Sequence, residues 1–325
     1  MADDRGHSRL QNAAIALRAR QVASRAWSRG WLLGVLAVWV SASGAHCPQI
    51  LQQYTEPIPR ALQPTATLAQ VVDVVNDNSA RVQAFSTMQA KIITPGLPSI
   101  NANIVFQRPR SFSLVAQTAL LGPEIDLGSN DELFWFWIKR AQPPALFSCR
   151  HDQFAASAAR TIIPVEPEWL IEALGVVSFE KTAQIDGPFP VGNGRLEVRT
   201  RSMASGRPML RVTIVDDSRG VVLEEHVYDS QGVRLASAVM SRHLRDFESG
   251  ATLPRHIDIQ WPPAKFEMSI DMNNMQINQL TDEQRALFVK PMKPGYNEID
   301  LAQPNALAPP PSANGQQRAP ASTRY

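Results

Sequence analysis

Cys47 is the residue of this chain with the most distinctive possible chemistry, because a thiol at this position can become a thioether that carries diacylglycerol. An uncharged apolar run, WLLGVLAVWV at residues 31–40, precedes it. Arg25 and Arg29 lie before that run, and small residues at 41–45 follow it. A positive flank, a short apolar stretch and small residues are together typical of an export signal. We therefore predict export and lipid attachment at Cys47.

Other fates of this segment stay open. Residues 43–45 also suit ordinary signal peptidase, which would leave a chain beginning at His46, and a lipoprotein signal has Gly or Ala where His46 stands. The uncharged stretch at 30–45 could instead be retained as an anchor, although a spanning helix needs about 20 residues. Cys149 is the only other cysteine, and it is either a disulfide partner of Cys47 or a buried thiol.

Residue types used in catalysis and metal binding form no recognisable constellation. The histidines are His7, His46, His151, His226, His243 and His256. None belongs to a helical zinc-protease pair, and no Ser stands in a nucleophile elbow. The adjacent Glu224 and Glu225 are interpreted as solvated strand residues. We therefore predict no enzymatic activity, no metal site and no cofactor.

The charge of the chain is unevenly distributed. The formal net charge is +2, but the first 46 residues contain six Arg and two Asp, which leaves 26 basic and 28 acidic residues in the remainder. The body of the protein therefore has no basic excess of the kind that binds nucleic acid. We exclude nucleic acid as a partner.

Four segments follow from composition. Residues 1–46 are predicted to be a signal peptide with a long N-terminal extension, and residues 47–66 a Pro-rich tether. Residues 67–301 are predicted to be one folded domain. Residues 302–325 are rich in Pro, Ala and Gln and are predicted to be a disordered tail.

The folded domain is predicted to be mainly β, with a few short helices. An amphipathic helix is expected after Thr67, another at 167–175, and a short one after the capping box that Thr281 begins. Residues 124–131 are expected to be a turn. Residues 221–278 alternate apolar and polar positions between turns, which predicts an antiparallel meander with one buried face.

The segment ELFWFWIK at 132–139 is apolar on both faces of a predicted strand, so it is either a central core strand or the wall of a pocket. Together with other large apolar residues it defines a candidate apolar cleft. Its predicted lining is Phe112, Leu114, Phe134, Trp135, Phe136, Trp137, Trp169 and Trp261.

The order of these elements resembles the LolA/LolB-like superfamily of bacterial envelope lipoprotein carriers. The resemblance covers about residues 67–301, and its most specific part comprises 229–232, 250–254, 277–278 and 288–295. It implies a curved, incomplete antiparallel barrel of about eleven strands whose concave, apolar side is plugged by helices and receives acyl chains. The family's regulatory arginine is not matched to a position, and Arg108 and Arg195 are candidates near strand ends.

Two functions are consistent with this resemblance. The first is a membrane-tethered envelope protein, periplasmic or at the outer membrane, that holds acyl chains of lipids or lipoproteins in an apolar cleft. The second is a structural or sensing lipoprotein with the same fold that binds an envelope protein partner and carries no lipid. The space beside ELFWFWIK and the first helix separates the two: an empty space is expected of the lipid binder, and a filled space would contradict that function.

Overall fold

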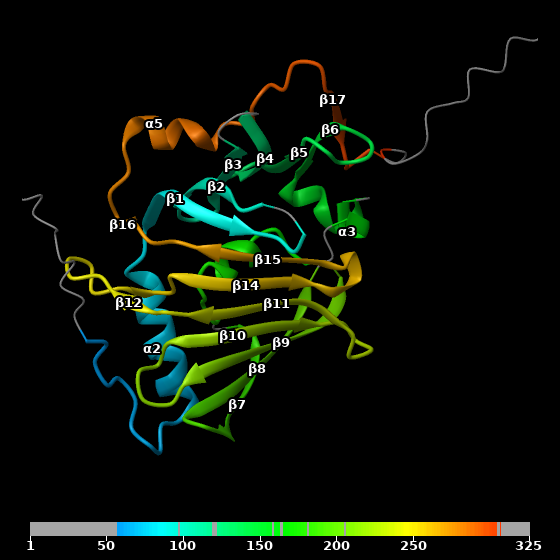
Figure 1. The fold of residues 1–325 in the computed structure, drawn as a ribbon. Coiled ribbons are helices and arrows are strands. Elements are labelled where there is room, and N and C mark those ends of the chain that lie inside the picture. The colour runs from blue at the N-terminus through cyan, green and yellow to red at the C-terminus, as the bar shows by residue number, and fades with distance from the viewer. Residues whose placement is uncertain are drawn as a thin grey trace, which may run out of the picture. The chain divides into compact units, whose positions relative to one another are not determined.

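A computed structural model of the chain describes residues 57–303 and 306, apart from positions 97, 119–121, 158, 163–164, 181 and 205. This part consists mainly of one large, curved and unclosed sheet (Figure 1). The predicted signal peptide, Cys47 and almost all of the predicted tail lie outside the described residues. The predicted mainly-β fold with a few helices is confirmed.

The strands of the large sheet are β1 (Ala84–Ile93), β2 (Ile100–Gln107), β3 (Ser111–Thr118), β4 (Gly122–Ser129), β5 (Leu133–Ile138), β6 (Ala145–Arg150), β7 (Gln184–Gly192), β8 (Arg195–Ala204), β9 (Arg207–Asp216), β10 (Val222–Tyr228), β11 (Arg234–Ser241), β14 (His256–Trp261), β15 (Phe266–Asp271), β16 (Met275–Ile277) and β17 (Asn297–Asp300). A separate pair is formed by β12 (Leu244–Arg245) and β13 (Thr252–Leu253). The helices are α2 (Leu68–Ala80), η1 (His151–Ala156), α3 (Ala159–Ile162), α4 (Trp169–Ala173), η2 (Pro262–Ala264), α5 (Asp282–Arg285) and η3 (Ala286–Phe288).

Two antiparallel meanders meet in the middle of this sheet. β6 to β1 form one side, and β15, β14 and β11 to β7 form the other. They join where Ile92 of β1 pairs with Ile270 of β15. β17 differs from the rest, because it pairs with β6 in parallel. Within the described residues the sheet has fifteen strands, where the resemblance implied about eleven.

Two strands that the sequence did not predict account for part of this difference. The expected turn at 124–131 is mostly β4, in which Glu124 and Asp126 are buried beside Lys139 and Lys293. Charged residues can occupy a strand when they find ionic partners there. β7 contains Pro188 and Pro190 and lies at the end of the sheet, where a missing N–H is tolerated.

The predicted helix after Thr67 is confirmed as α2. Thr67 and Gln70 form a reciprocal capping box: the Gln70 N–H donates to Thr67 Oγ1 at 3.4 Å, and the Thr67 N–H donates to Gln70 Oε1 at 2.8 Å. Val71 and Val75 on one side of the helix are buried against the sheet. The helix is therefore held at its start by capping and along its length by packing.

Residues 57–66, the end of the predicted tether, lie against the domain. The N–H groups of Ala61 and Leu62 both donate to the Ser218 carbonyl oxygen, at 2.8 and 2.9 Å, and Leu62 is buried in the main core. Among the helices of the described residues, none is long and apolar enough to span a membrane.

Candidate functional site

The predicted cleft residues do not all lie on one surface. Phe112 and Leu114 are buried in the main core, and cross-strand pairing places Phe134 and Phe136 on the same face of the sheet. Trp169 and Trp261 complete this side, with ring centroids 6.1 Å apart. Phe134 and Phe136 nevertheless pack into a second cluster, with Phe147, Phe154 and Leu301.

Trp135 and Trp137 lie on the opposite face, so their inclusion in the cleft is corrected. Trp135 Nε1 donates to Asp126 at 3.1 Å, and Lys293 stands 4.6 Å from the centroid of the Trp137 ring. Tyr296 packs edge-on against Trp137. Neighbouring residues of a strand point to opposite faces, so ELFWFWIK is covered on both sides.

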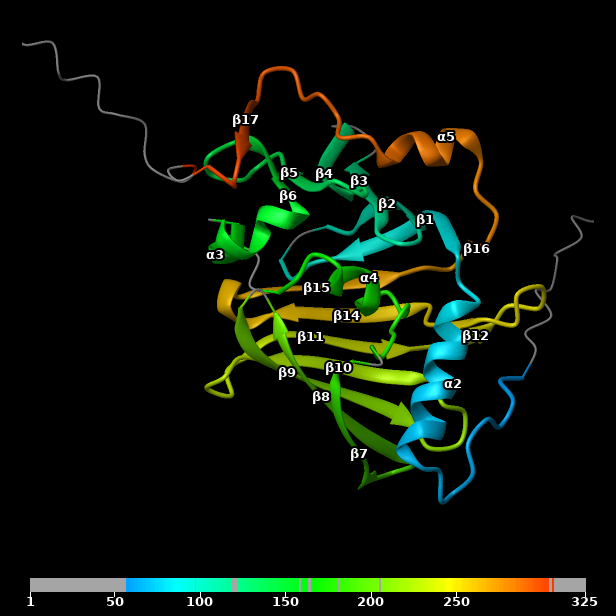
Figure 2. The same cartoon turned by 180° about the vertical axis from the view of Figure 1, so that it is seen from behind.

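The concave face is occupied by α2 and by residues 165–179, which we call the cover segment (Figure 2). Its buried apolar residues are Val165, Trp169, Ile171, Ala173, Leu174, Val176, Val177 and Phe179. The predicted helix at 167–175 is confirmed only as the five-residue α4, and Gly175 ends it with a φ of 100°. The space beside α2 is therefore filled: the pocket lined by Val75 and Val177 measures about 10 Å³.

Polar contacts hold the cover segment at three places. Near its start, Glu168 Oε1 lies 3.4 Å from Arg110 Nη1 and 3.4 Å from His151 Nδ1. Near its end, Asn76 of α2 binds both backbone groups of Phe179, donating to the carbonyl at 3.0 Å and accepting from the N–H at 2.7 Å. Between them, Glu172 reaches the floor of the sheet.

That third contact is a buried ion cluster. Arg211 of β9 meets Glu172 through two contacts, Nη1 to Oε1 at 3.0 Å and Nη2 to Oε2 at 2.9 Å, and its Nε lies 3.4 Å from Glu225 Oε1. Burial raises the pKa of Glu225 to about 8 although Arg211 opposes this, and burial also raises the pKa of Glu172. Burial lowers the pKa of Arg211, but the effect of the two carboxylates is larger than that of burial, so the pKa of Arg211 is raised overall. Two carboxylates thus share one guanidinium.

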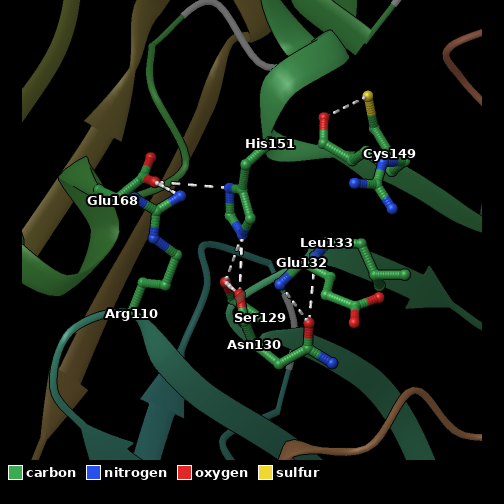
Figure 3. Close-up of polar contacts among 9 residues, drawn as sticks. Arg110, Ser129, Asn130, Glu132, Leu133, Cys149, His151 and Glu168 are labelled. Carbon is green, nitrogen blue, oxygen red and sulfur yellow. Dashed lines mark hydrogen bonds and ion pairs between the residues drawn. The ribbon is translucent and has the colours of Figure 1, made fainter.

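A polar pocket of about 370 Å³ opens beside the start of the cover segment (Figure 3). It is lined by Arg110, Asp131, Glu132, Arg150, His151, Asp152, Phe154, Glu166, Pro167 and Glu168. Its lining is charged, so it differs from the predicted apolar cleft. His151 lies between Glu168 on one side and Ser129 on the other.

This Ser–His–Glu order does not supply a nucleophile. Ser129 Oγ is 3.2 Å from His151 Nε2, but Nε2 is also 3.0 Å from the Asn130 carbonyl oxygen. A carbonyl oxygen only accepts, so Nε2 must carry the proton and cannot receive one from Ser129. Among the described residues, no group of three or more His, Cys, Asp or Glu is placed to hold a metal ion.

The sequence analysis missed the buried ion cluster of Glu172, Arg211 and Glu225, whereas it did single out Arg108 and Arg195. Glu225 was interpreted as solvated, yet it is 0% exposed. The only signal of its burial in the sequence is that it lies two residues before Val227, on the same face of β10. Arg108 donates to the Ser79 and Val82 carbonyl oxygens at 2.8 Å and so supports the end of α2. Arg195 pairs with Glu224 in a more exposed position.

No family model matches the chain, and no curated protein matches it in sequence. Among solved structures, it is similar to one from Vibrio parahaemolyticus named as an outer membrane lipoprotein-sorting protein domain (TM-score 0.45, 10% identity, 67% of this chain and 98% of that one). It is also similar to a LolA superfamily protein from Nitrosomonas europaea (TM-score 0.43, 10% identity, 67% of this chain and 96% of that one). A third similar structure is that of a DUF1329 family protein from Desulfovibrio piger (TM-score 0.42, 13% identity, 65% of this chain and 95% of that one).

Proposed function

We propose that this protein binds the acyl chains of a lipid or lipoprotein on the concave face of its sheet, and that the cover segment moves aside to admit them. One observation carries the proposal: the apolar face of an unclosed sheet is filled by a mostly irregular segment that polar contacts hold in place. The order of sequence elements that resembles envelope carriers leads to the same function.

The free energy needed to displace the cover segment and the free energy gained by burying acyl chains are of comparable size. The cover segment buries seven apolar side chains larger than Ala, and exposing each costs about 1.5–3 kcal/mol, or roughly 10–20 kcal/mol in all. A sixteen-carbon chain regains about 12 kcal/mol at about 0.8 kcal/mol per CH₂, and two chains regain about 24 kcal/mol. For chains transferred from water, two acyl chains therefore offset full displacement over the whole of this range, whereas a single chain offsets it only at the lower end.

The proposed setting is the bacterial envelope. The signal-like residues 31–45 support export, and acylation of Cys47 would tether the domain to a membrane in the periplasm. Of the Pro-rich residues 47–66, only 47–56 would then set the distance between the membrane and the domain, because 57–66 lie against the domain.

The chain offers a matched pair of variants that tests the moving cover. Asn76 and Asn78 each make two hydrogen bonds to a backbone, Asn76 to Phe179 of the cover segment and Asn78 to Thr252 of β13. Asn76→Ala should favour opening of the cover by roughly 5- to 100-fold, because each lost hydrogen bond contributes about 0.5–1.5 kcal/mol. Asn78→Ala removes equivalent bonds elsewhere and should leave the cover closed.

The assay is native mass spectrometry of the full chain after incubation with phosphatidylcholine vesicles that contain dipalmitoylglycerol. We expect a one-to-one lipid adduct that forms faster with Asn76→Ala than with the wild type or Asn78→Ala. Hydrogen exchange at Phe179 should accelerate in the same variant. Absence of an adduct in all three proteins would refute lipid binding.

The second candidate function is a structural or sensing protein that binds an envelope partner without lipid. It is favoured by the closed packing of the concave face, where Trp169 is 2% exposed and the pocket lined by Val75 and Val177 is about 10 Å³. The same experiment separates the two, since this function predicts that no variant acquires lipid.

A further inference from the structure

A polar patch lies in the floor of the concave face, beneath the cover segment. It consists of Thr200 of β8, Arg211 and Thr213 of β9, and Glu225 of β10. Register pairs Arg211 with Thr200, and Thr213 with Glu225, so all four side chains share one face of the sheet. Apolar residues surround them, including Val198, Val227 and Ala238.

This patch is incompletely satisfied when the cover is closed. Within the described residues, neither hydroxyl oxygen of Thr200 and Thr213 has a hydrogen-bond partner, and neither oxygen of Glu225 has one. All three side chains are at least nine-tenths buried. Buried polar groups are normally paired, so a group of unpaired ones on one face indicates a place where another polar group binds.

The cover segment shows what kind of group fits. Glu172 Oε1 accepts a hydrogen bond from Arg211 Nη1 at 3.0 Å, and Oε2 lies in ion-pair contact with Nη2 at 2.9 Å but has no hydrogen-bond partner among the described residues. This two-pronged geometry suits a carboxylate or phosphate equally. When the cover segment moves away, Glu172 leaves with it and Arg211 loses this anionic partner.

We infer that the patch of Arg211, Thr200, Thr213 and Glu225 binds an anionic oxygen group, a carboxylate or a phosphate, carried by the acyl-bearing ligand, and that Glu172 occupies this site in the closed protein. The inference rests on the proposed function and adds the chemical class of the ligand. Arg211 supplies the charge, and the threonine hydroxyls supply hydrogen-bond donors that the closed structure leaves unused.

Charge at the patch is consistent with this role. In the closed protein, burial raises the pKa of Glu225 to about 8, with Arg211 opposing and Glu172 adding to the effect, so its carboxyl is largely protonated at pH 7 while the cover segment is in place. A bound anion would keep it protonated, because like charge disfavours ionisation. The other charged groups that act on the cluster are Glu168 and Glu180, in and next to the cover segment, which leave with Glu172.

The test compares lipids that share two palmitoyl chains and differ in the polar group. The full chain is titrated with dipalmitoyl phosphatidate, with dipalmitoylglycerol hemisuccinate and with neutral dipalmitoylglycerol, and lipid adducts are measured by native mass spectrometry. The wild type should bind the phosphate or the carboxylate lipid at least about tenfold more tightly than the neutral one, because a hydrogen-bonded charge pair contributes that much or more. The two anionic lipids show which group the site prefers.

The sharpest variant is Thr200→Val with Thr213→Val. Valine keeps the shape of threonine, and the hydroxyls have no partner in the closed protein, so stability should be retained. Affinity for the anionic lipid should fall roughly tenfold, while affinity for dipalmitoylglycerol stays the same. Arg199→Gln, which removes an exposed arginine of β8 that pairs with Glu197, is the control and should change neither.

Each outcome bears on a different claim. Equal wild-type affinity for anionic and neutral lipids would overturn the anionic site but leave acyl binding intact. An unchanged preference in the double threonine variant would also overturn it. Inorganic phosphate that binds alone as tightly as phosphatidate would show that the group need not be carried by acyl chains. If no lipid binds, the proposed function fails and the anionic site fails with it.

Discussion

Replacing Glu225 with Gln should remove a strong pH dependence from the stability of this protein. Glu225 is fully buried beside Glu172 and Arg211, and burial raises its pKa from 4.5 to about 8. The native state therefore keeps this proton over a pH range in which the unfolded chain has lost it. The contribution to stability is complete below about pH 4.5 and is lost as the pH rises to about 8.

The size of the effect follows from that interval. At about 1.4 kcal/mol per unit of pH, the range from 4.5 to about 8 corresponds to on the order of 5 kcal/mol. Gln has the shape of Glu and does not titrate. The free energy of unfolding of the wild type minus that of Glu225→Gln should therefore decrease steadily between pH 5 and pH 8.

Urea unfolding followed by tryptophan fluorescence at pH 5, 6, 7 and 8 measures this difference. Glu197→Gln is the control, because Glu197 is a carboxylate of the nearby strand β8 that pairs with Arg199 and with no histidine among the described residues. We expect the control to run parallel to the wild type. A difference between wild type and Glu225→Gln that stays constant from pH 5 to pH 8 would refute a buried, protonated carboxyl at this position.

Two further substitutions test the packing of the domain. Gly128→Ala places a Cβ 2.1 Å from the Trp135 ring and should cost about 1–3 kcal/mol in urea unfolding without changing lipid affinity, because Trp135 faces away from the concave side. Combining it with Trp135→Ala should make the glycine substitution nearly neutral, and full additivity would contradict the clash. Thr67→Ala should cost about 1 kcal/mol through loss of the α2 cap, and an unchanged unfolding midpoint would show that packing alone holds this helix.

Local periodicity was sufficient for much of the fold. One face of β14 carries Ile257, Ile259 and Trp261, and the two isoleucines are fully buried, as the alternation along the strand predicts. Thr67 and Thr281 mark helix starts through capping boxes that depend on residues only three positions away. Such signals are readable because their physical cause lies within a few residues.

Predictions failed where partners are distant in the chain. Residues 124–131 have the composition of a turn. Ion pairs with Lys139, Arg140 and Lys293, together with the hydrogen bond from Trp135 to Asp126, make Glu124 and Asp126 acceptable in β4. Glu225 was interpreted as solvated because its partners Glu172 and Arg211 come from α4 and β9. For Glu124 and Asp126, ionic partners outweigh the local preference of a charged residue for water, whereas Glu225 is buried as a largely protonated carboxyl.

Local patterns were enough to predict most of the antiparallel strands, the capped helices, the candidate acylation site at Cys47 and the apolar residues available for a core. Which of those residues share a surface became visible in the folded chain. The tertiary structure placed Phe112 and Leu114 on the concave side and Trp135 and Trp137 on the other, and it filled the concavity with residues 165–179. The physical reason is that hydrophobic burial is non-directional, so a tryptophan that packs a core and one that lines a binding surface are identical in sequence until the partner that covers them is known.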